Sequence, residues 1–224
     1  TAAVPSRGSE RGHAVSQRPR TKGLDASRWQ AGIDFPACRA AGFEFVALRA
    51  TMGARGEDPL YSRFRRECEE AGIFVISYHL EYPDVDAVAQ VDNLVRVAGE
   101  GPFALDVEPP DDYPPATYRQ WRETTQAACY EASARFGWPP LVYGSHDFLD
   151  ALELPDDLRD CPLWATGWGT RGVRVPRPWR RATLVQTGKE RSPNARGPHA
   201  GPITDVNEYE GTLEQLSAEV TFNG

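Results

Sequence analysis

The alternation of β-rich and amphipathic segments is the feature that most constrains the fold of this chain. Segments rich in β-branched or aromatic residues lie at 24–27, 43–48, 73–80, 103–107, 140–144, 162–166, 182–187 and 203–207. Helical patterns separate the first five of them, at residues 35–41, 61–72, 84–98 and 117–136. Strands that alternate with crossover helices form a parallel sheet, and eight such strands favour closure into a barrel.

The later part of the chain is poor in helical patterns. Between residues 167 and 202 the sequence is dominated by Gly, Pro and Arg. The predicted fold class is therefore α/β, with a modified (β/α)8 TIM-like barrel that is irregular and helix-poor in its last strands. A chain of 224 residues fits one sizeable core, so residues 23–224 are predicted to form a single barrel domain.

Residues 1–22 differ from the rest in composition and are predicted to be a disordered basic tail. The tail carries five basic residues and one acidic residue, which gives it +4 and leaves −11 for the remainder of the total of −7. It lacks the hydrophobic centre of a signal peptide. Because the sequence begins with Thr1 rather than Met, we expect that an upstream segment was removed or omitted, consistent with a cleaved secretion signal. The expected location is extracellular.

Composition argues against several other classes of protein. The net charge of −7 argues against a nucleic-acid partner, and no stretch is long and apolar enough to span a membrane. The four cysteines are far apart and lack a C-x-x-C pair, which argues against a zinc site but leaves two disulfides or four buried thiols open. His79 is expected to be a hydrogen-bonded barrel residue. We expect a monomer without a metal or other cofactor.

The stretch "FALDVEPPDD", residues 103–112, places two acids one residue apart before two prolines. If the segment is a strand, Asp106 and Glu108 project from the same face, because side chains alternate along a strand. An isolated pair of this kind is often only a solvated strand end. Its significance therefore depends on what the other strand ends carry.

The ends of the other predicted strands carry further acids. In a parallel barrel the carboxyl ends of the strands converge on one mouth, which would bring together Asp25, Asp106, Glu108 and Asp205. Like charges in a partly buried mouth raise one another's pKa values. A protonated carboxylic acid beside an ionised carboxylate is what glycosidic cleavage requires.

Aromatic and amide side chains accompany these acids at the strand ends. Sugar rings stack on aromatic rings and hydrogen-bond to amides, so the predicted substrate-binding residues are Tyr78, Tyr143, Trp164, Trp168 and Gln186. For each aromatic residue taken alone, core packing is the alternative.

Six ordered blocks of the sequence resemble those of one enzyme family. They are "GLDASRWQAGIDFPACRAAGFEFVALRAT", "DPLYSRFRRECEEAGIFVISYHL", "ALDVE", "LVYG", "PLWATGW" and "ITDVNEYEGTLEQL", and together they cover about residues 22–217. They are similar to the successive motifs of the glycoside hydrolase family 25 muramidases, the Chalaropsis-type lysozymes. The resemblance implies a modified β/α barrel that cleaves the β-1,4 bond between N-acetylmuramic acid and N-acetylglucosamine in peptidoglycan, without a cofactor.

The resemblance also implies roles for individual residues. Glu108 matches the general acid and Asp106 its partner, while Asp25 and Asp205 match the acids of the first and last strands. We expect Glu108 to be partly buried, with its pKa raised by that burial and by Asp106. Whether Asp106 acts through the 2-acetamido group of the substrate or as a covalent nucleophile is left open by the sequence, and the first is our hypothesis.

Two departures from the family pattern affect the predicted mouth. The family often reads Lys-Ala-Thr-Glu-Gly after the second strand, where this chain has Arg49 to Gly53 and lacks the acid. It often reads Trp-Gln-Tyr near the seventh strand, where this chain has Val185, Gln186 and Thr187. Two alternatives to a muramidase remain: a glycan-binding barrel that has lost turnover, and a hydrolase whose clustered carboxylates hold Mg²⁺ or Ca²⁺.

Overall fold

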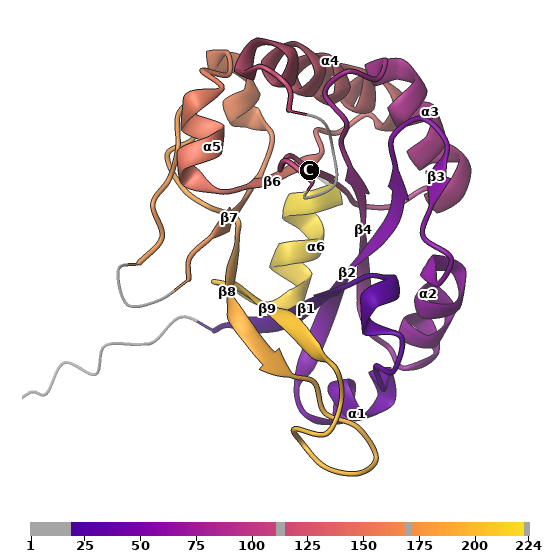
Figure 1. Cartoon of the computed structure of the whole chain (residues 1–224). Helices are drawn as coiled ribbons and strands as arrows, with labels where there is room; N and C mark the ends of the chain where they lie inside the picture. Colours follow the sequence, from indigo (N-terminus) through magenta and orange to yellow (C-terminus); the bar gives the residue numbers. More distant parts are fainter. Residues whose placement is uncertain (1–18, 111–114, 169–171, 222–224) are drawn as a thin grey trace, which may run out of the picture.

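The computed structural model describes residues 19–110, 115–168 and 172–221 (Figure 1). The strands are β1 Thr21–Ala26, β2 Phe43–Met52, β3 Gly56–Glu57, β4 Phe74–Leu80, β5 Phe103–Asp106, β6 Leu141–Gly144, β7 Leu163–Thr166, β8 Leu184–Arg191 and β9 Ile203–Tyr209. The helices are α1 Phe35–Ala40, α2 Tyr61–Glu70, α3 Ala87–Ala98, α4 Tyr118–Phe136, α5 His146–Ala151 and α6 Leu213–Thr221. Two short 3₁₀ helices, η1 Arg28–Gln30 and η2 Asp156–Asp160, complete the set.

The strands close into the predicted barrel. Their order in the sheet is β1-β9-β8-β7-β6-β5-β4-β2-β3, and an additional pairing of β1 with β2 closes the ring. The short β3 only extends the end of β2, with which it pairs antiparallel. Eight strands therefore form the wall, and the predicted helices at residues 35–41, 61–72, 84–98 and 117–136 are confirmed as α1 to α4.

The direction of the last strand differs from the prediction. β9 runs antiparallel to both of its neighbours, β8 and β1. No crossover helix lies in the described connection between β8 and β9, and a connection of this kind turns the chain back on itself, so the paired strands become antiparallel. Asp205 therefore lies near the start of β9 rather than at its carboxyl end. It still reaches the mouth, because the reversed strand presents its beginning there.

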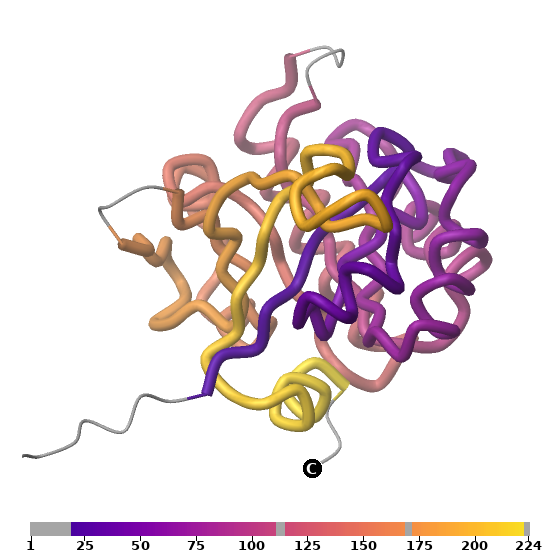
Figure 2. Tube along the Cα trace, turned by 90° about the horizontal axis from the view of Figure 1, so that it is seen from below, coloured from indigo at the N-terminus to yellow at the C-terminus, as the bar shows by residue number. Residues whose placement is uncertain are grey.

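The interior of the barrel has its own hydrophobic core, distinct from the core between the sheet and the outer helices. Side chains from the barrel wall meet Leu216 and Val220 of α6 in one cluster, which also contains Phe45, Ile76, Leu141, Trp164 and Leu184. Figure 2 shows the yellow α6 across one end of the barrel. α6 follows the carboxyl end of the reversed β9, so it closes the end opposite the mouth. The sequence analysis had not predicted this helix.

The alternation of side chains in β2 explains how the two cores share one wall. Phe45 and Ala47 face the barrel interior, whereas Val46 and Leu48 face the helices. Gly23 of β1 makes room for the ring of Phe45, because a Cβ atom at this glycine would overlap that ring. The close approach of β1 and β2 that completes the barrel therefore depends on a glycine at this position.

The remaining predictions about organisation have mixed outcomes. The four cysteines are buried thiols, so the alternative of buried hydrophobes holds in this structure. Thr21 and Lys22, which the sequence analysis assigned to the tail, belong to β1, and Thr21 Oγ1 donates to the carbonyl oxygen of Gly211 at 2.8 Å. Residues 1–18 of the predicted tail lie outside the described residues. In the described part of the chain, no helix combines the length and apolar character needed to cross a bilayer.

Replacing Gly23 by alanine tests the closure of the barrel. We expect Gly23→Ala to lower the free energy of unfolding by about 1–3 kcal/mol, because the added methyl group displaces the buried ring of Phe45. Gly32→Ala is the matched control, since a Cβ atom there has nothing within 4 Å and its effect should stay within about 1 kcal/mol of either sign. Urea unfolding of both variants measures the difference, and equal stabilities would contradict this account of Gly23.

Candidate active site

A cavity of about 500 Å³ lies at the mouth of the barrel. It brings together all the acids that the sequence analysis placed at strand ends. Its lining includes the acids Asp25, Asp106, Glu108 and Asp205, the aromatic residues Trp29, Tyr78, Tyr82, Tyr143 and Trp164, the cations Arg28, Arg49 and Lys189, and Gln186. Trp168 does not line the cavity directly but contacts Gln186. Residues far apart in the sequence therefore meet in one polar cleft.

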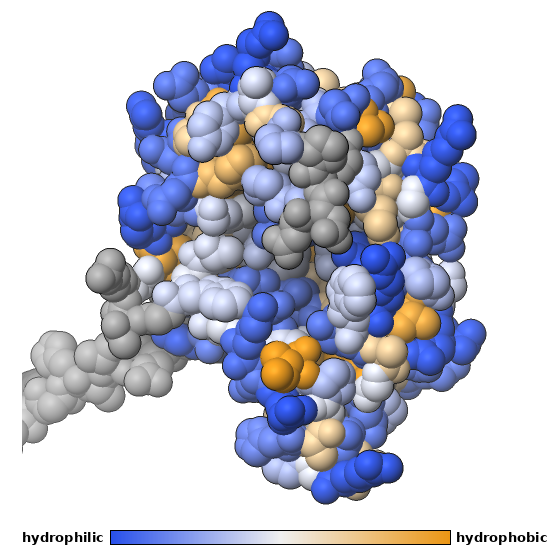
Figure 3. Space-filling model, viewed as in Figure 1, coloured by the Kyte–Doolittle hydropathy of each residue, from blue (hydrophilic) through white to orange (hydrophobic). Residues whose placement is uncertain are grey.

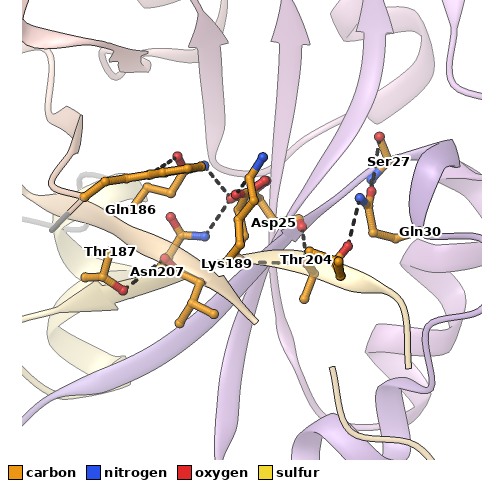
Figure 4. Close-up of polar contacts among 12 residues, drawn as sticks. Asp25, Ser27, Gln30, Gln186, Thr187, Lys189, Thr204 and Asn207 are labelled. Atoms are coloured by element: carbon orange, nitrogen blue, oxygen red, sulfur yellow. Dashed lines mark hydrogen bonds and ion pairs between the residues drawn. The ribbon is translucent and has the colours of Figure 1, made fainter. Parts of the chain in front are cut away.

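Two amide side chains hold the Asp25 carboxylate (Figure 4). Gln186 Nε2 and Asn207 Nδ2 each donate to Asp25 Oδ2 at 2.9 Å. Asn207 Oδ1 accepts from Trp164 Nε1 at 2.8 Å. Gln186 Oε1 accepts from Trp168 Nε1 at 2.9 Å and from the Tyr143 hydroxyl at 3.1 Å. Because an indole N–H can only donate, each amide must turn its oxygen to the indole and its NH₂ group to Asp25.

The aromatic residues of the site differ in how much of their rings they offer to a ligand. Trp164 is 2% exposed and packs against Tyr143, with ring centroids 4.7 Å apart, and against Tyr78 at 6.3 Å. Trp168 is 51% exposed, and Lys189 Nζ lies 4.9 Å from the centroid of its ring. The buried rings are thus suited to holding the amides in place, and the exposed indole to contact with a ligand.

The pKa values of Asp25 and Asp205, the acids of the first and last strands, are both raised. The pKa of Asp25 is raised to about 7, first by burial and then by the charges of Asp205 and Glu108, while the hydrogen bonds from Asn207 and Gln186 oppose the shift. Burial also raises the pKa of Asp205, against the opposing charge of Lys189, whose Nζ lies 3.7 Å from Asp205 Oδ1. Asp25 is therefore poised to gain or lose a proton near neutral pH.

Asp106 is the more strongly perturbed member of the D-x-E pair. It is 8% exposed, and its Oδ1 atom has no hydrogen-bond partner among the described residues. Burial first, and then the charges of Glu108 and Asp25, raise the pKa of Asp106 well above its usual range, while Arg49 opposes the shift. A buried acceptor without a donor is costly, so this oxygen is ready for a group that a ligand supplies.

Glu108 is exposed, whereas the sequence analysis expected it to be partly buried. The ladder of β5 ends at Asp106, and Val107 turns into the outer core, so the next side chain points to the mouth. Pro109 and Pro110 cannot donate to a ladder and take the chain out of the sheet. The predicted shared face of Asp106 and Glu108 thus holds, but the strand end separates a buried acid from an exposed one.

Basic residues at the mouth are the main group that the sequence analysis missed. Arg49 is fixed by the buried Asp58, whose Oδ2 accepts from Arg49 Nε at 3.1 Å and from the backbone N–H of Arg28 at 2.9 Å. The motif comparison had noted Arg49 only as part of a stretch that lacks an acid. A carboxylate nevertheless reaches this region from Asp58, which adjoins β3, so the tertiary structure supplies an acid that the local stretch lacks.

His79 is a buried ionisable residue near the end of β4. His79 Nε2 donates to Gln90 Oε1 at 3.1 Å and its Nδ1 accepts from Thr51 Oγ1 at 2.7 Å, which confirms the predicted hydrogen-bonded barrel histidine. Burial lowers the pKa of His79 to about 4, so it is neutral at pH 7.

No group of three or more His, Cys, Asp or Glu residues suited to a metal ion occurs in the described ranges.

Glu81 lies behind Asp106 and was not predicted. It is fully buried, its Oε1 accepts from Thr125 Oγ1 at 3.0 Å, and its backbone N–H donates to the Asp106 carbonyl oxygen at 3.1 Å. Burial raises the pKa of Glu81 to about 8. Its Oε2 atom lacks a hydrogen-bond partner in the described part of the structure. A neutral acid next to the D-x-E strand avoids adding another negative charge at pH 7.

Comparison with known proteins assigns the chain to a family. The family model described as "Glycosyl hydrolases family 25" matches residues 24–192. The chain belongs to this family. The match includes Asp25, Asp106, Glu108 and Gln186, and it ends before Asp205, which the pairing of β1 with β9 places opposite Asp25. As a member of a glycosyl hydrolase family, the chain is an enzyme of the glycoside hydrolase class.

Relatives of known sequence or structure agree with this assignment. Lysozyme M1 of Streptomyces globisporus is 25% identical over 215 residues, which cover 88% of this chain and 70% of that protein. The protein YegX of Escherichia coli K12, which is uncharacterized, is 26% identical over 208 residues that cover 88% of this chain and 72% of YegX. The crystal structure of the bacterial lysozyme from Streptomyces coelicolor superposes with a TM-score of 0.81 at 22% identity, over 91% of this chain and 98% of that one. This family 25 member therefore has the lysozyme barrel fold.

The buried Glu81 predicts a pH dependence of stability. Between its ordinary pKa of 4.5 and its folded value of about 8, the folded state keeps a proton that the unfolded state releases, so the free energy of unfolding falls as pH rises. Glu81→Gln keeps the acceptor for Thr125 and removes this loss. We expect the melting temperature of the variant, relative to wild type, to increase from pH 5 to pH 8. Glu100→Gln in the exposed turn before β5 is the control; a constant difference for Glu81→Gln across this range would refute the role assigned to burial.

Proposed function

We propose that this family 25 glycoside hydrolase is a peptidoglycan muramidase, which hydrolyses the β-1,4 bond between N-acetylmuramic acid and N-acetylglucosamine. The observation that carries the proposal is the D-x-E pair at the mouth, where a buried Asp106 adjoins an exposed Glu108. Glycosidic cleavage needs one carboxyl group that donates a proton and another that carries negative charge near the anomeric carbon. The family assignment and the likeness to Lysozyme M1 support the substrate class.

In the proposed mechanism Asp106 and Glu108 share a proton whose position depends on the substrate. In the free protein, burial favours the proton on Asp106. The N–H of the substrate's acetamido group would donate to Asp106 Oδ1, which lacks a donor, and this hydrogen bond favours the ionised form of Asp106. The proton then resides on the exposed Glu108, which protonates the leaving O4 as general acid.

Asp25 and Asp205 are proposed to hold the sugar ring and the attacking water. The two amides occupy Asp25 Oδ2, so its other oxygen is available to a substrate hydroxyl or water. Asp205 Oδ1 likewise has no hydrogen-bond partner within the described ranges, although Lys189 lies 3.7 Å away. The proposed substrate contacts of Tyr78, Tyr143, Trp164, Trp168 and Gln186 fall into two kinds. Trp168, which contacts Gln186 beside the cavity, offers an exposed ring, whereas Tyr143, Trp164 and Gln186 hold Asp25 in position and Tyr78 packs against Trp164.

The structure also bears on the metal-dependent alternative. A hard cation at Asp25 would need oxygen ligands around it, but the two nearest side chains turn their NH₂ groups to this carboxylate. Their orientation is fixed by the indole N–H groups of Trp164 and Trp168. The donor set thus favours an acid–base role over a ligand role.

We place the activity at the cell wall or outside the cell, because peptidoglycan is the proposed substrate, and we expect the enzyme to act as a monomer.

Glu108→Gln tests the general acid. The amide keeps the shape of the side chain and cannot protonate the leaving oxygen, so we expect the rate of wall clearance to fall by about a hundredfold or more. Turbidity of purified cell walls and release of reducing ends measure the loss, with Glu100→Gln as a control of equal charge change. Near wild-type clearance by Glu108→Gln would remove Glu108 from the mechanism.

Dialysis against EDTA tests the metal-dependent alternative. Wild type should keep its activity after this treatment. A loss of activity that added Mg²⁺ or Ca²⁺ restores would favour the metal-dependent alternative.

The stereochemistry of the first product tests the part assigned to the acetamido group. Attack by this group and then by water inverts the anomeric centre twice, so we expect the β-anomer as the first product seen by proton NMR. An initial α-anomer would contradict this mechanism. If the β-anomer is seen, trapping with a fluorinated sugar decides between the two retaining routes, because a label found on Asp106 or Asp25 would mean a covalent nucleophile.

A further inference from the structure

We propose that Arg28 and Trp29 form a second binding subsite, on the η1 side of the cleft, for the carboxylate groups of the peptide that a muramic residue carries. This proposal rests on the proposed function and names the part of the substrate that this subsite selects. Both residues line the same cavity as Asp25 and Asp106. Neither belongs to the set of acids and rings that the sequence analysis assigned to the site.

Trp29 is an exposed indole with a cation stacked on it. The ring is 71% exposed, and the guanidinium carbon of Arg28 lies 4.7 Å from its centroid. Hydrophobic packing gains little from an indole in this position. On the face that Figure 3 shows, strongly hydrophobic residues are scattered among hydrophilic ones, so the described residues there form no broad apolar patch of the kind that binds a protein partner.

The turn that carries the pair is held at several points. The Ser27 backbone N–H donates to Gln30 Oε1 at 2.9 Å, and Gln30 Nε2 donates to the Ile203 carbonyl oxygen at 3.3 Å. The Arg28 backbone N–H donates to the buried Asp58 at 2.9 Å. Figure 4 shows Ser27 and Gln30 on one side of Asp25 and Gln186 on the other. The cleft is therefore flanked by a preorganised turn, which loses little conformational entropy when a ligand binds.

The charge of Arg28 is available to a ligand, unlike that of the other two cations of the cleft. Arg49 is paired with Asp58 at 3.1 Å, and Lys189 lies 3.7 Å from Asp205. Within the described residues, no carboxylate lies at ion-pair distance from the Arg28 guanidinium. A guanidinium that stacks on an indole still presents its N–H groups in the plane, in the geometry that a carboxylate accepts.

The charge pattern of the cleft identifies the occupant. Four acids line the cavity, and two of its three cations, Arg49 and Lys189, lie beside carboxylates of the protein. An uncharged segment of a ligand therefore fits over the acids better than an anionic group does. In peptidoglycan the sugar hydroxyls and acetamido groups are uncharged, and the lactyl group is joined to the peptide as an uncharged amide, so the negative charges lie on the carboxylates of the peptide. When the glycosidic bond lies over Asp106 and Glu108, the peptide carboxylates must extend to the rim, where Arg28 can bind them.

The test compares glycan strands that carry native peptides with the same strands after conversion of the peptide carboxylates to amides. We expect wild type to have a KM about two- to fivefold lower for the native strands, the range for an exposed ion pair, at similar kcat. Arg28→Gln should lose this preference without a change in kcat. Arg66→Gln, at an exposed position of α2 that does not line the cavity, carries the same charge change and should keep the preference.

Binding measured in the Glu108→Gln background separates this proposal from the proposed function. There we expect the native strands to bind two- to fivefold more tightly than the amidated ones, about the effect of an exposed ion pair, and Arg28→Gln to abolish the difference. If wild type cleaves neither substrate, the muramidase proposal fails while this binding comparison still decides the subsite. Equal affinity for the two substrates, or a preference that survives Arg28→Gln, overturns the subsite.

Discussion

The pairing of β1 with β9 is the interaction on which the site depends. It joins the first strand of the barrel to the last and sets Asp25 directly opposite Asp205 in the register of the two strands. The same pairing brings Asn207 to the Asp25 carboxylate and lets Thr204 Oγ1 donate to the Asp25 carbonyl oxygen at 2.7 Å. Because β9 is reversed, it contributes its beginning to the mouth and delivers α6 to the opposite end. One antiparallel strand therefore completes the acidic site and also seals the core.

Gathering acids in a barrel mouth is unfavourable, and the surrounding side chains offset only part of the cost. The two amides stabilise the charged form of Asp25, Arg49 does so for Asp106, and Lys189 for Asp205. The pKa of each of these acids nevertheless remains raised, and oxygens of Asp106 and Asp205 lack donors among the described residues. Such residual strain is common at functional sites, since a bound substrate can supply the missing interactions.

Much of the fold was predictable because its determinants are local. The alternation of β-rich and helical segments predicted the barrel strands and α1 to α4, and the two-residue period of a strand predicted that Asp106 and Glu108 share a face. The rule that strand ends converge predicted which acids meet. The direction of β9 was not predictable in the same way, because it depends on the path of the chain between β8 and β9 and not on the pattern within either strand.

The sequence by itself determined the family, the barrel and the identity of the acids at its mouth, because short-range periodicity and ordered motifs encode them. The tertiary structure alone decided how each acid is solvated. Only the folded chain places Glu81 behind Asp106, Asp58 against Arg49, and the amides of Gln186 and Asn207 on one oxygen of Asp25. Burial and pKa depend on neighbours that are distant in sequence, so no local pattern reveals that Asp106 is enclosed while Glu108 is exposed.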